Sequence, residues 1–233
     1  MSRRFAMRLA PFFGVLILIF SSLPCAAEPA DESLLAYAVN VHRTPMQTWG
    51  PGFGIYLGRG IFITAAHVVG RSWLNRPKIA IGGKEYPTRT VKEGSLEGID
   101  LTLLAVDESL LPMSLRMRRI SLCRIPPWPG EEVVTIVPGA AVRSRVISPQ
   151  RLPRDVQKFD TVIGDVASTG NSGSGVFDLR QRCLLGIMSR KISQTQTRPD
   201  TGKTEIHDIA KYFVPASTID AFIPDEIRPL TAQ

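Results

Sequence analysis

Residues 61–69 read Ile-Phe-Ile-Thr-Ala-Ala-His-Val-Val and begin directly after Gly60. The first four residues form a β-rich apolar run, which is typical of a short strand that starts after a turn. A short helix is predicted over residues 65–69, because Gly70 follows them. Among the three histidines of the chain, only His67 stands in such a strand-then-turn setting, and the small alanines before it leave room for another element to pack beneath the imidazole.

Segments of this kind recur along the chain. Short β-rich runs are separated by Gly, Pro, Asn or Asp, which is typical of an antiparallel barrel or sandwich. Long runs with the period of a helix are missing, so the chain is predicted to be all-β. A second short helix is expected over residues 217–222, before Pro224 and with Ser217 as its cap. The predicted strands cover residues 53–57, 61–64, 78–81, 101–106, 132–137, 183–189 and 212–214.

Residues 115–130 differ in composition from the segments on either side. They contain four arginines followed by three prolines, which indicates a connection between two halves of similar size. The chain has 233 residues, 44% of them hydrophobic, which is enough for a buried core and argues against disorder. We therefore predict two β units, residues 28–120 and 121–233.

The N-terminal segment has the pattern of a secretory signal peptide. Three arginines within the first eight residues precede an uncharged run over residues 9–20, and small residues follow at 25–27. We predict that residues 1–27 are cleaved off and that the protein is exported, to the periplasm or the extracellular space. A retained N-terminal anchor is the main alternative. Lipidation at Cys25 is disfavoured because Pro24 stands where lipoprotein signals have a small residue.

The charge and the cysteine content of the chain limit which partners and cofactors can be expected. Cleavage would remove three arginines and lower the formal charge from +7 to +4, which is ordinary for a solvated surface. The arginines of residues 116–124 have no interleaved aromatic residues, so we expect no nucleic-acid partner. In an oxidising compartment Cys123 and Cys183 could form a disulfide, and the sequence leaves this question open. Neither cysteine has a metal-ligand companion at close spacing, so no metal or cofactor is expected. No later stretch is long and apolar enough to span a membrane.

Two further segments carry the groups that could work with His67. Asp100 opens an apolar run, and a carboxylate beside such a strand needs a buried partner, although it could equally cap a turn. Residues 170–175 read Gly-Asn-Ser-Gly-Ser-Gly, so Ser172 would project from a tight turn, although a flexible Gly/Ser turn is the alternative for this segment taken alone. A serine hydroxyl becomes a nucleophile only with a base such as histidine, which in turn needs a carboxylate to fix its tautomer.

Three motifs together resemble the signatures of chymotrypsin-like (trypsin-fold) serine proteases. They are residues 64–67 (Thr-Ala-Ala-His), 100–104 (Asp-Leu-Thr-Leu-Leu) and 170–173 (Gly-Asn-Ser-Gly). The sequence is most similar to bacterial exported members, such as glutamyl endopeptidases and the protease domains of HtrA proteins, which also carry Asn before the serine. The resemblance covers nearly all of the mature chain. It implies two six-stranded antiparallel barrels with the active site between them, and a secreted endopeptidase that acts on protein or peptide substrates.

The resemblance also implies a role for each candidate residue. His67 is the general base and then the general acid, Asp100 orients it, and Ser172 is the nucleophile that forms an acyl-enzyme. The backbone amides of Gly170 and Ser172 form the oxyanion hole.

Substrate-binding positions follow from the same alignment of motifs. Val166 stands where the family has the floor of the pocket for the P1 side chain, the residue before the cut bond. Ser189 ends the strand that lines the substrate cleft, and it is expected to contact Asp100.

Departures from the family pattern refine these expectations. Asn171 replaces the aspartate that pairs with a newly cut N-terminus in trypsin-type members, so no such activation is expected. Ser174 replaces the second glycine after the nucleophile, as in glutamyl endopeptidases. The apolar Val166 predicts small or medium apolar P1 residues, while the neighbouring Asp165 leaves a basic preference open. A preference for Glu is not supported, because Met188 stands where glutamyl endopeptidases have a histidine.

Two other interpretations of the sequence compete with the interpretation as a triad protease. An α/β-hydrolase esterase would use Ser172, Asp200 and His207, but Ser174 occupies the place of a required glycine and the alternating long helices are missing. A catalytically inactive member of the trypsin fold, acting as a binding or regulatory module, is the second alternative. Reaction with a fluorophosphonate probe separates this module from the enzyme.

Overall fold

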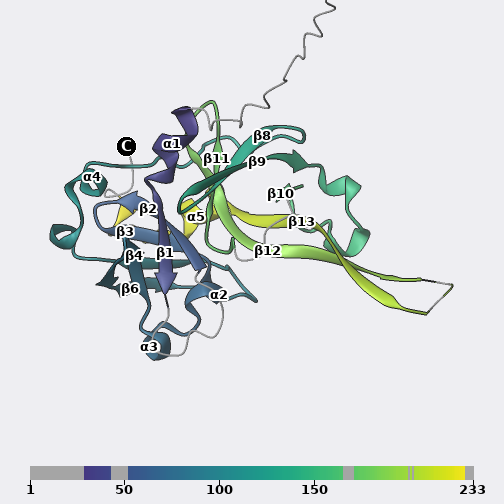
Figure 1. Ribbon diagram of the computed structural model, residues 1–233, viewed down its shortest axis with the longest axis horizontal. Helices are drawn as coiled ribbons and strands as arrows, with labels where there is room; N and C mark the ends of the chain where they lie inside the picture. Colours follow the sequence, from purple (N-terminus) through teal and green to yellow (C-terminus); the bar gives the residue numbers. More distant parts are fainter. Residues whose placement is uncertain (1–28, 43–51, 165–170, 199, 201, 229–233) are drawn as a thin grey trace, which may run out of the picture.

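The computed structural model describes residues 29–42, 52–164, 171–198, 200 and 202–228. The predicted signal peptide, Val166 and Gly170 lie outside these residues. The described part of the chain is mostly β, in two units that lie side by side (Figure 1). Within it, none of the helices is both long and apolar enough to cross a membrane.

The first unit is a curved antiparallel sheet with the strand order β5-β4-β1-β2-β3-β7-β6. Its two edge strands, β5 and β6, are consecutive in the sequence and are separated only by Thr88. The sheet therefore curves round until its edges meet at this residue, and β5 and β6 together act as one bent strand of a six-stranded barrel. The strands are β1 (Ala38–His42), β2 (Gly52–Gly58), β3 (Ile61–Thr64), β4 (Lys78–Ile81), β5 (Lys84–Pro87), β6 (Arg89–Glu93) and β7 (Thr102–Ala105).

The second unit is a closed antiparallel barrel with the strand order β10-β13-β12-β11-β8-β9, which confirms the predicted six-stranded architecture. Strands β12 and β13 continue well beyond the barrel as a two-stranded hairpin (Figure 1). Only the parts of these two strands that lie in the barrel are predicted from the sequence. The strands are β8 (Glu132–Val137), β9 (Ala140–Ile147), β10 (Val162–Ile163), β11 (Gly175–Asp178), β12 (Leu184–Thr197) and β13 (Thr204–Pro215).

Short helices sit at the ends of the strands. They are α1 (Pro29–Leu35), α2 (Ala66–Val69), α3 (Ser72–Asn75), α4 (Met113–Arg116) and α5 (Ala216–Phe222). The predicted C-terminal helix is present as α5, but the predicted cap is wrong. Helix α5 begins one residue before Ser217, and Pro215 precedes it without a side-chain hydrogen bond to the first turn. Helix α1, which the strand pattern gave no reason to expect, packs against β8 and β9.

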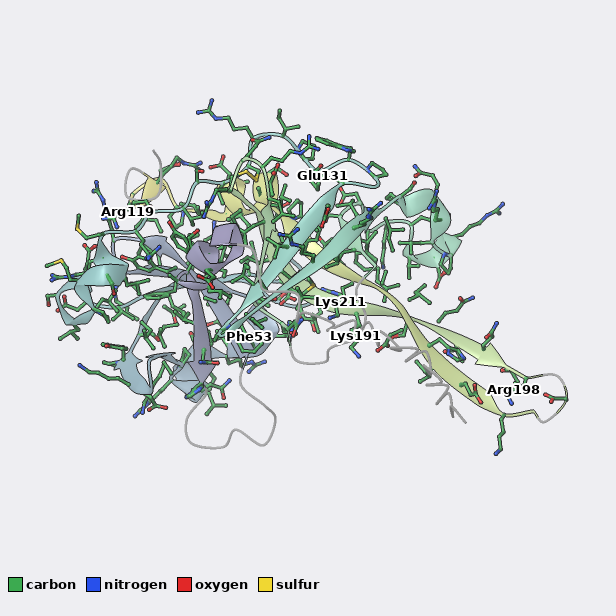
Figure 2. All side chains as sticks on the ribbon, turned by 45° about the horizontal axis from the view of Figure 1, so that its top comes forward. Phe53, Arg119, Glu131, Lys191, Arg198 and Lys211 are labelled. Carbon is green, nitrogen blue, oxygen red and sulfur yellow. A yellow bond between two sulfur atoms is a disulfide. The ribbon has the colours of Figure 1, made fainter. Side chains whose placement is uncertain are left out.

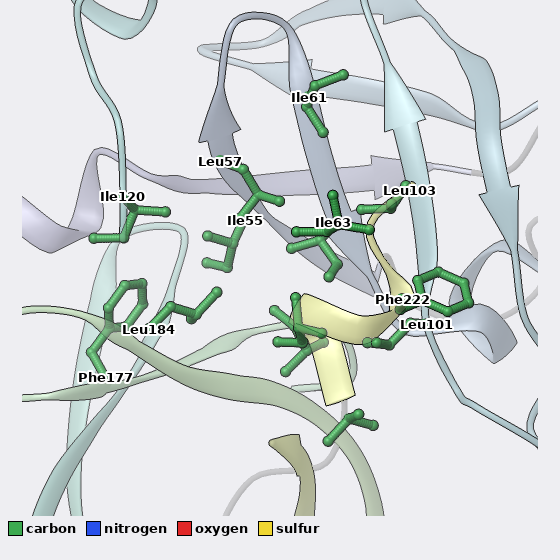
Figure 3. Packing of buried hydrophobic residues seen from close by; sticks show 14 of the residues in the cluster. Ile55, Leu57, Ile61, Ile63, Leu101, Leu103, Ile120, Phe177, Leu184 and Phe222 are labelled. Atoms are coloured by element: carbon green, nitrogen blue, oxygen red, sulfur yellow. The ribbon is translucent and has the colours of Figure 1, made fainter. Parts of the chain in front are cut away.

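The largest hydrophobic cluster lies between the two units and joins them. It combines side chains of β2, β3 and β7 with side chains of β8, β11, β12 and helix α5. Figure 3 shows Ile63 and Leu103 of the first unit near Phe222 of α5, and, on the left of the view, Phe177 and Leu184 of the second unit near Ile120. Separate clusters fill the interior of each unit. Because the shared cluster is fully buried, the two units pack as one body, which fixes the position of any residue at their seam.

A disulfide ties the connection between the units to the second barrel. Cys123 is bonded to Cys183, with Cα atoms 5.0 Å apart, which answers the question left open by the sequence. The backbone N–H of Cys123 also donates to the Leu184 carbonyl at 3.0 Å, directly at the start of β12.

Removing this disulfide should destabilise the protein without changing its fold. The bond closes a loop with a sequence separation of 60 residues. The double variant Cys123→Ala/Cys183→Ala should therefore lose roughly 2–4 kcal/mol in the free energy of unfolding. Urea unfolding checks this value, with the wild-type protein in reductant as the matched control. Equal unfolding midpoints for the oxidised wild type and the double variant would show that the bond contributes nothing.

Candidate active site

His67 and Asp100 form a directly hydrogen-bonded pair at the end of the first barrel. Helix α2 places His67 so that its Nδ1 donates to Asp100 Oδ2 at 2.8 Å, with Oδ1 at 3.1 Å. The backbone N–H of His67 donates to the same carboxylate at 3.0 Å. The Asp100 side chain is 1% exposed and that of His67 is 30% exposed. Because a carboxylate only accepts, the contact fixes the tautomer of the neutral imidazole with its proton on Nδ1, so Nε2 is the nitrogen that can act as a base.

Asp100 is held in place from the second barrel as well. Ser189 of β12 donates its hydroxyl to Asp100 Oδ2 at 2.5 Å, so the predicted contact between these two residues is present. Burial raises the pKa of Asp100, but the hydrogen bonds from His67 and Ser189 outweigh burial and hold that pKa below its usual value. The carboxylate is therefore ionised at neutral pH, and its bonds reach across two barrels instead of capping a local turn.

The lowered pKa of Asp100 makes a prediction about stability at acid pH. A carboxyl group with a lower pKa in the folded state stabilises the fold above its unfolded pKa of about 4, and this contribution is lost as the pH falls through its folded pKa. The difference in unfolding free energy between the wild type and Asp100→Asn should therefore shrink between pH 5 and pH 3. Urea titrations at both pH values measure it, and an unchanged difference would contradict the assignment of the charge to Asp100.

Backbone hydrogen bonds connect the turn that carries Ser172 to both barrels. The carbonyl of Ser172 accepts from the backbone N–H of Phe53 in β2 at 2.9 Å. The N–H of Gly173 donates to the Met188 carbonyl in β12 at 2.8 Å. Within the turn, the Ser174 hydroxyl donates to the Asn171 carbonyl at 2.5 Å. Ser172 therefore lies at the seam between the units, in a turn whose backbone is fixed on both sides.

Gly173 allows this turn to approach the histidine strand closely. Its φ is +85°, a region that glycine adopts without strain. A Cβ at this position would overlap the Phe53 carbonyl oxygen and Oγ1 of Thr64. Thr64 itself donates to the Phe53 carbonyl at 2.5 Å and lies three residues before His67. The Ser172 turn and the segment that leads to His67 are thus in direct contact.

A side chain at position 173 should disturb both stability and activity. The variant Gly173→Ala would combine an unfavourable positive φ with a backbone overlap, so it should cost about 1–3 kcal/mol in unfolding free energy. Gly139→Ala is the matched control, because Gly139 also has a positive φ but nothing within 4 Å of an added Cβ. Thermal or urea unfolding of the two variants should show the larger loss for Gly173→Ala, and the reverse order would contradict the close approach.

A small cavity of about 30 Å³ lies beside the Ser172 turn. Ser172 and Ser189 both line this cavity. The hydrogen-bonded series His67–Asp100–Ser189 therefore ends at the cavity that Ser172 also lines. Of the residues that the structure describes, Asn171, Met188, Arg190, Lys191 and Lys211 also line it. The predicted pocket floor Val166 and the predicted oxyanion residue Gly170 lie outside the described residues.

Lys211 is the lining residue that the sequence analysis missed. It stands in the run Ala210-Lys211-Tyr212-Phe213-Val214, and a single charge in such an apolar segment is the signal that could have found it. No feature of the sequence indicates that Phe53 and Thr64 contact the Ser172 turn, because these contacts depend on how the two barrels pack.

The alternative set Ser172, Asp200 and His207 does not fit this architecture. Asp200 and His207 belong to the β12–β13 hairpin, where His207 faces Gln194 across the ladder and its Nε2 lies 3.5 Å from Glu205. The strands are antiparallel, whereas an α/β-hydrolase has a parallel sheet. In the described part of the chain, no three or more His, Cys, Asp or Glu residues are grouped as metal ligands.

Comparison with known proteins supports the architecture. No family model matches the sequence, and no curated protein matches it either. Solved structures do match. The active form of the Rv3671c protease from M. tuberculosis is 19% identical, with a TM-score of 0.59 over 97% of this chain and 96% of that one.

Two further solved structures give the same result. The serine endoprotease from Yersinia pestis is 18% identical, with a TM-score of 0.57 over 85% of this chain and 65% of that one. The MamO protease domain from Magnetospirillum magneticum is 20% identical, with a TM-score of 0.54 over 84% of this chain and 100% of that one. Similarity at this level of identity establishes the architecture, and the chain has the chymotrypsin-like fold of these proteases.

Proposed function

We propose that this protein is a serine endopeptidase that cleaves peptide bonds through an acyl-enzyme. The observation that carries the proposal is the buried His67–Asp100 pair, held by Ser189 and placed at the same seam as the Ser172 turn. In the first step Ser172 Oγ attacks the substrate carbonyl carbon while His67 Nε2 takes the hydroxyl proton. His67 then gives this proton to the leaving amine, and the acyl-enzyme and the new N-terminus result.

The second half of the reaction repeats these roles with water. His67 Nε2 takes a proton from a water molecule as its oxygen attacks the acyl carbon, and it returns the proton to Ser172 as the ester bond breaks. Asp100 stabilises the imidazolium in both halves through its bond to Nδ1 and is not itself protonated.

The amides of Gly170 and Ser172 are proposed as the oxyanion hole. Two hydrogen bonds, from the Phe53 N–H to the Ser172 carbonyl and from the Gly173 N–H to Met188, hold the peptide group that follows Ser172. Backbone donors preorganised around the reacting carbonyl stabilise a developing negative charge, and one such donor is worth about 10²–10³ in rate. Val166 is proposed at the P1 pocket floor, and the substrate backbone is proposed to pair alongside Ser189.

Export and the two-domain division are proposed with the same function. The Cys123–Cys183 disulfide supports an oxidising destination for the chain after removal of residues 1–27. The division into residues 28–120 and 121–233 is supported by the strand ladders, since β1–β7 pair among themselves and β8–β13 do likewise.

Peptide hydrolysis by the purified protein tests the proposal. Internal bonds of a peptide library should be cut by the wild type and left intact by Ser172→Ala and by His67→Ala in parallel preparations. Cleavage that persists in both variants would refute the assignment. No cleavage by the folded wild type, together with no fluorophosphonate labelling, would favour the inactive binding module.

A further inference from the structure

Arg190 of β12 connects the two units close to Asp100 through two hydrogen bonds from one guanidinium group. Its Nη2 donates to the Leu96 carbonyl of the first unit at 2.7 Å. Its Nε donates to Oγ of the neighbouring Ser189 at 3.3 Å. Figure 2 shows Lys191, the next residue along β12, at the base of the hairpin, where the hairpin leaves the barrel. Arg190 therefore lies at the seam of the two units, and the mechanism described above gives it no role.

An irregularity in β12 makes the contact between Arg190 and Ser189 possible. Successive side chains of a regular strand point to opposite faces of the sheet, so their end groups are directed apart. In the β12–β13 ladder Met188 pairs with Phe213. Arg190 then pairs with Tyr212, the adjacent residue of β13, so Ser189 is an extra residue in β12. A bulge of this kind re-aims the side chains next to it, and here it brings two consecutive side chains together.

The bond from Arg190 fixes the direction of the Ser189 hydroxyl group. A serine hydroxyl has one proton and rotates to suit its neighbours. Because Nε of Arg190 donates to the oxygen, the hydroxyl proton is directed to Oδ2 of Asp100, which lies 2.5 Å away. The same Oδ2 accepts from Nδ1 of His67 at 2.8 Å. The donors thus form one directed series that runs from the guanidinium group to the carboxylate that holds the imidazole.

The second bond of Arg190 fixes the loop that leads to Asp100. Residues 95–99 come directly before Asp100, and all of them are exposed. An exposed loop has few packing contacts to hold it. The bond to the Leu96 carbonyl attaches this loop to β12 of the other unit. Arg190 therefore restricts the position of Asp100 relative to Ser189 from both sides of the seam.

The charge of Arg190 acts in the same region as the charge of Asp100. Burial raises the pKa of Tyr212, and the charge of Asp160 raises that pKa further. Arg190 lowers the same pKa, and Asp100 raises it. The guanidinium carbon lies 5.8 Å from the centre of the Phe159 ring, and such a cation–π contact helps to hold the group in place. A fixed positive charge is thus part of the surroundings of the carboxylate.

We propose that Arg190 is a positioning residue for the catalytic triad. It directs the Ser189 hydroxyl to Asp100, and it holds the loop that carries this carboxylate against the second barrel. The inference rests on the proposed function and adds to it a residue that acts through Ser189 and Asp100 and not on the reacting atoms. Without Arg190, Asp100 keeps its bond to His67, but the Ser189 hydroxyl loses its fixed direction and the loop loses its link to β12.

The labelling rate with a small alkyl fluorophosphonate tests this role, because such a probe has no peptide part that could contact Arg190. Arg190→Met should lower the second-order rate constant at about pH 8.5 by roughly 3–30-fold, the range expected for coupling between residues in contact. Arg145→Met, which removes an exposed arginine of β9, is the matched control and should keep the wild-type rate. Urea unfolding of each variant shows that folded proteins are compared.

A double-mutant cycle shows whether Arg190 acts through Ser189. In Ser189→Ala there is no hydroxyl to direct, so the further change Arg190→Met should reduce the labelling rate by a clearly smaller factor than it does in the wild type. A loss of the same factor in both backgrounds would show that Arg190 acts independently of Ser189, and it would overturn the inference.

The pH profile of labelling separates positioning from a general loosening of the structure. Arg190→Met removes a positive charge near the His67–Asp100 pair, so protonation of the imidazole becomes easier. The fall of the rate on the acid side should therefore move to higher pH, by about 0.3–1 unit. Arg190→Lys keeps the charge but lacks the two separated donors of the guanidinium fork. Its profile should stay at the wild-type pH, while its maximal rate stays reduced.

The other charged groups of this region are unchanged in all these variants. In the described part of the chain they are Glu97, Lys158, Asp160, Lys191, Asp208 and Lys211. A difference between the profiles of Arg190→Met and Arg190→Lys therefore reports the charge at position 190.

The outcomes separate this inference from the proposed function. A wild-type rate in Arg190→Met, or full recovery of the rate in Arg190→Lys, would overturn the positioning role while labelling of Ser172 still supports the enzyme. A profile of Arg190→Met that moves to lower pH would also overturn it, because a loosened contact between His67 and Asp100 has that effect. Absence of labelling in the folded wild type would count against the proposed function and this inference together.

Discussion

Replacing Ser172 with alanine is expected to reduce turnover of a peptide substrate by about 10⁶, the loss seen when the nucleophile of such a triad is removed. The reason is that alanine has no hydroxyl with which to form the acyl-enzyme, so only direct attack by water remains. The fold should persist, because backbone hydrogen bonds hold the turn and alanine keeps them. Steady-state kinetics with a peptide that the wild type cleaves measures the loss, and urea unfolding measures the stability.

The matched control for this variant is Ser114→Ala. Ser114 is an exposed residue of helix α4 in the other unit, so its loss should leave both turnover and unfolding unchanged. Turnover within tenfold of the wild type in Ser172→Ala would show that another residue is the nucleophile.

The second large effect is expected for Asp100→Asn, which should lower turnover by about 10⁴. An asparagine amide keeps the shape of the carboxylate but presents an N–H group that can orient toward Nδ1 of His67. The imidazole then carries its proton on Nε2, where it cannot accept one from Ser172. The same variant also removes the charge that stabilises the imidazolium.

Measurement of kcat between pH 7 and pH 8 checks this value, and Ser189→Ala serves as a comparison. Ser189 supplies one of the hydrogen bonds to the Asp100 carboxylate, and its loss leaves the charge and the His67 contact in place. Its effect on turnover should therefore be much smaller. Equal effects of the two variants would contradict the separate role assigned to the carboxylate.

The strands that the sequence predicted have a buried apolar face, although β11, which is buried along its whole length, was missed. Residues 61–64 and 78–81 coincide with β3 and β4, because apolar runs bounded by turn residues have few alternatives in a small β unit. Strand β9 was missed, since only one of its eight residues, Val146, is buried and the polar residues Arg143–Arg145 interrupt its apolar sequence. The hairpin beyond Ser189 was missed for the same reason, because the outer part of β12 is exposed on both faces and has no hydrophobic alternation.

The candidate site, too, could be predicted only in part from the sequence. His67, Asp100 and Ser189 could be assigned from local motifs, and the structure brings these three into contact. The contact of the Ser172 turn with Phe53 could not be predicted, because it depends on the packing of one barrel against the other. The position of Lys211 on the wall of the cavity beside Ser172 could not be predicted either, because it depends on how β13 pairs with β12.

The central claim is that Ser172 is activated by the His67–Asp100 pair at the seam of the two barrels. Mass-spectrometric mapping of the protein after reaction with a fluorophosphonate tests it most directly. The account predicts one adduct, on Ser172, that forms in the wild type and is lost in His67→Ala, where the serine is still present but its base is missing. An adduct on another residue, or equally fast labelling of Ser172 in His67→Ala, would contradict it.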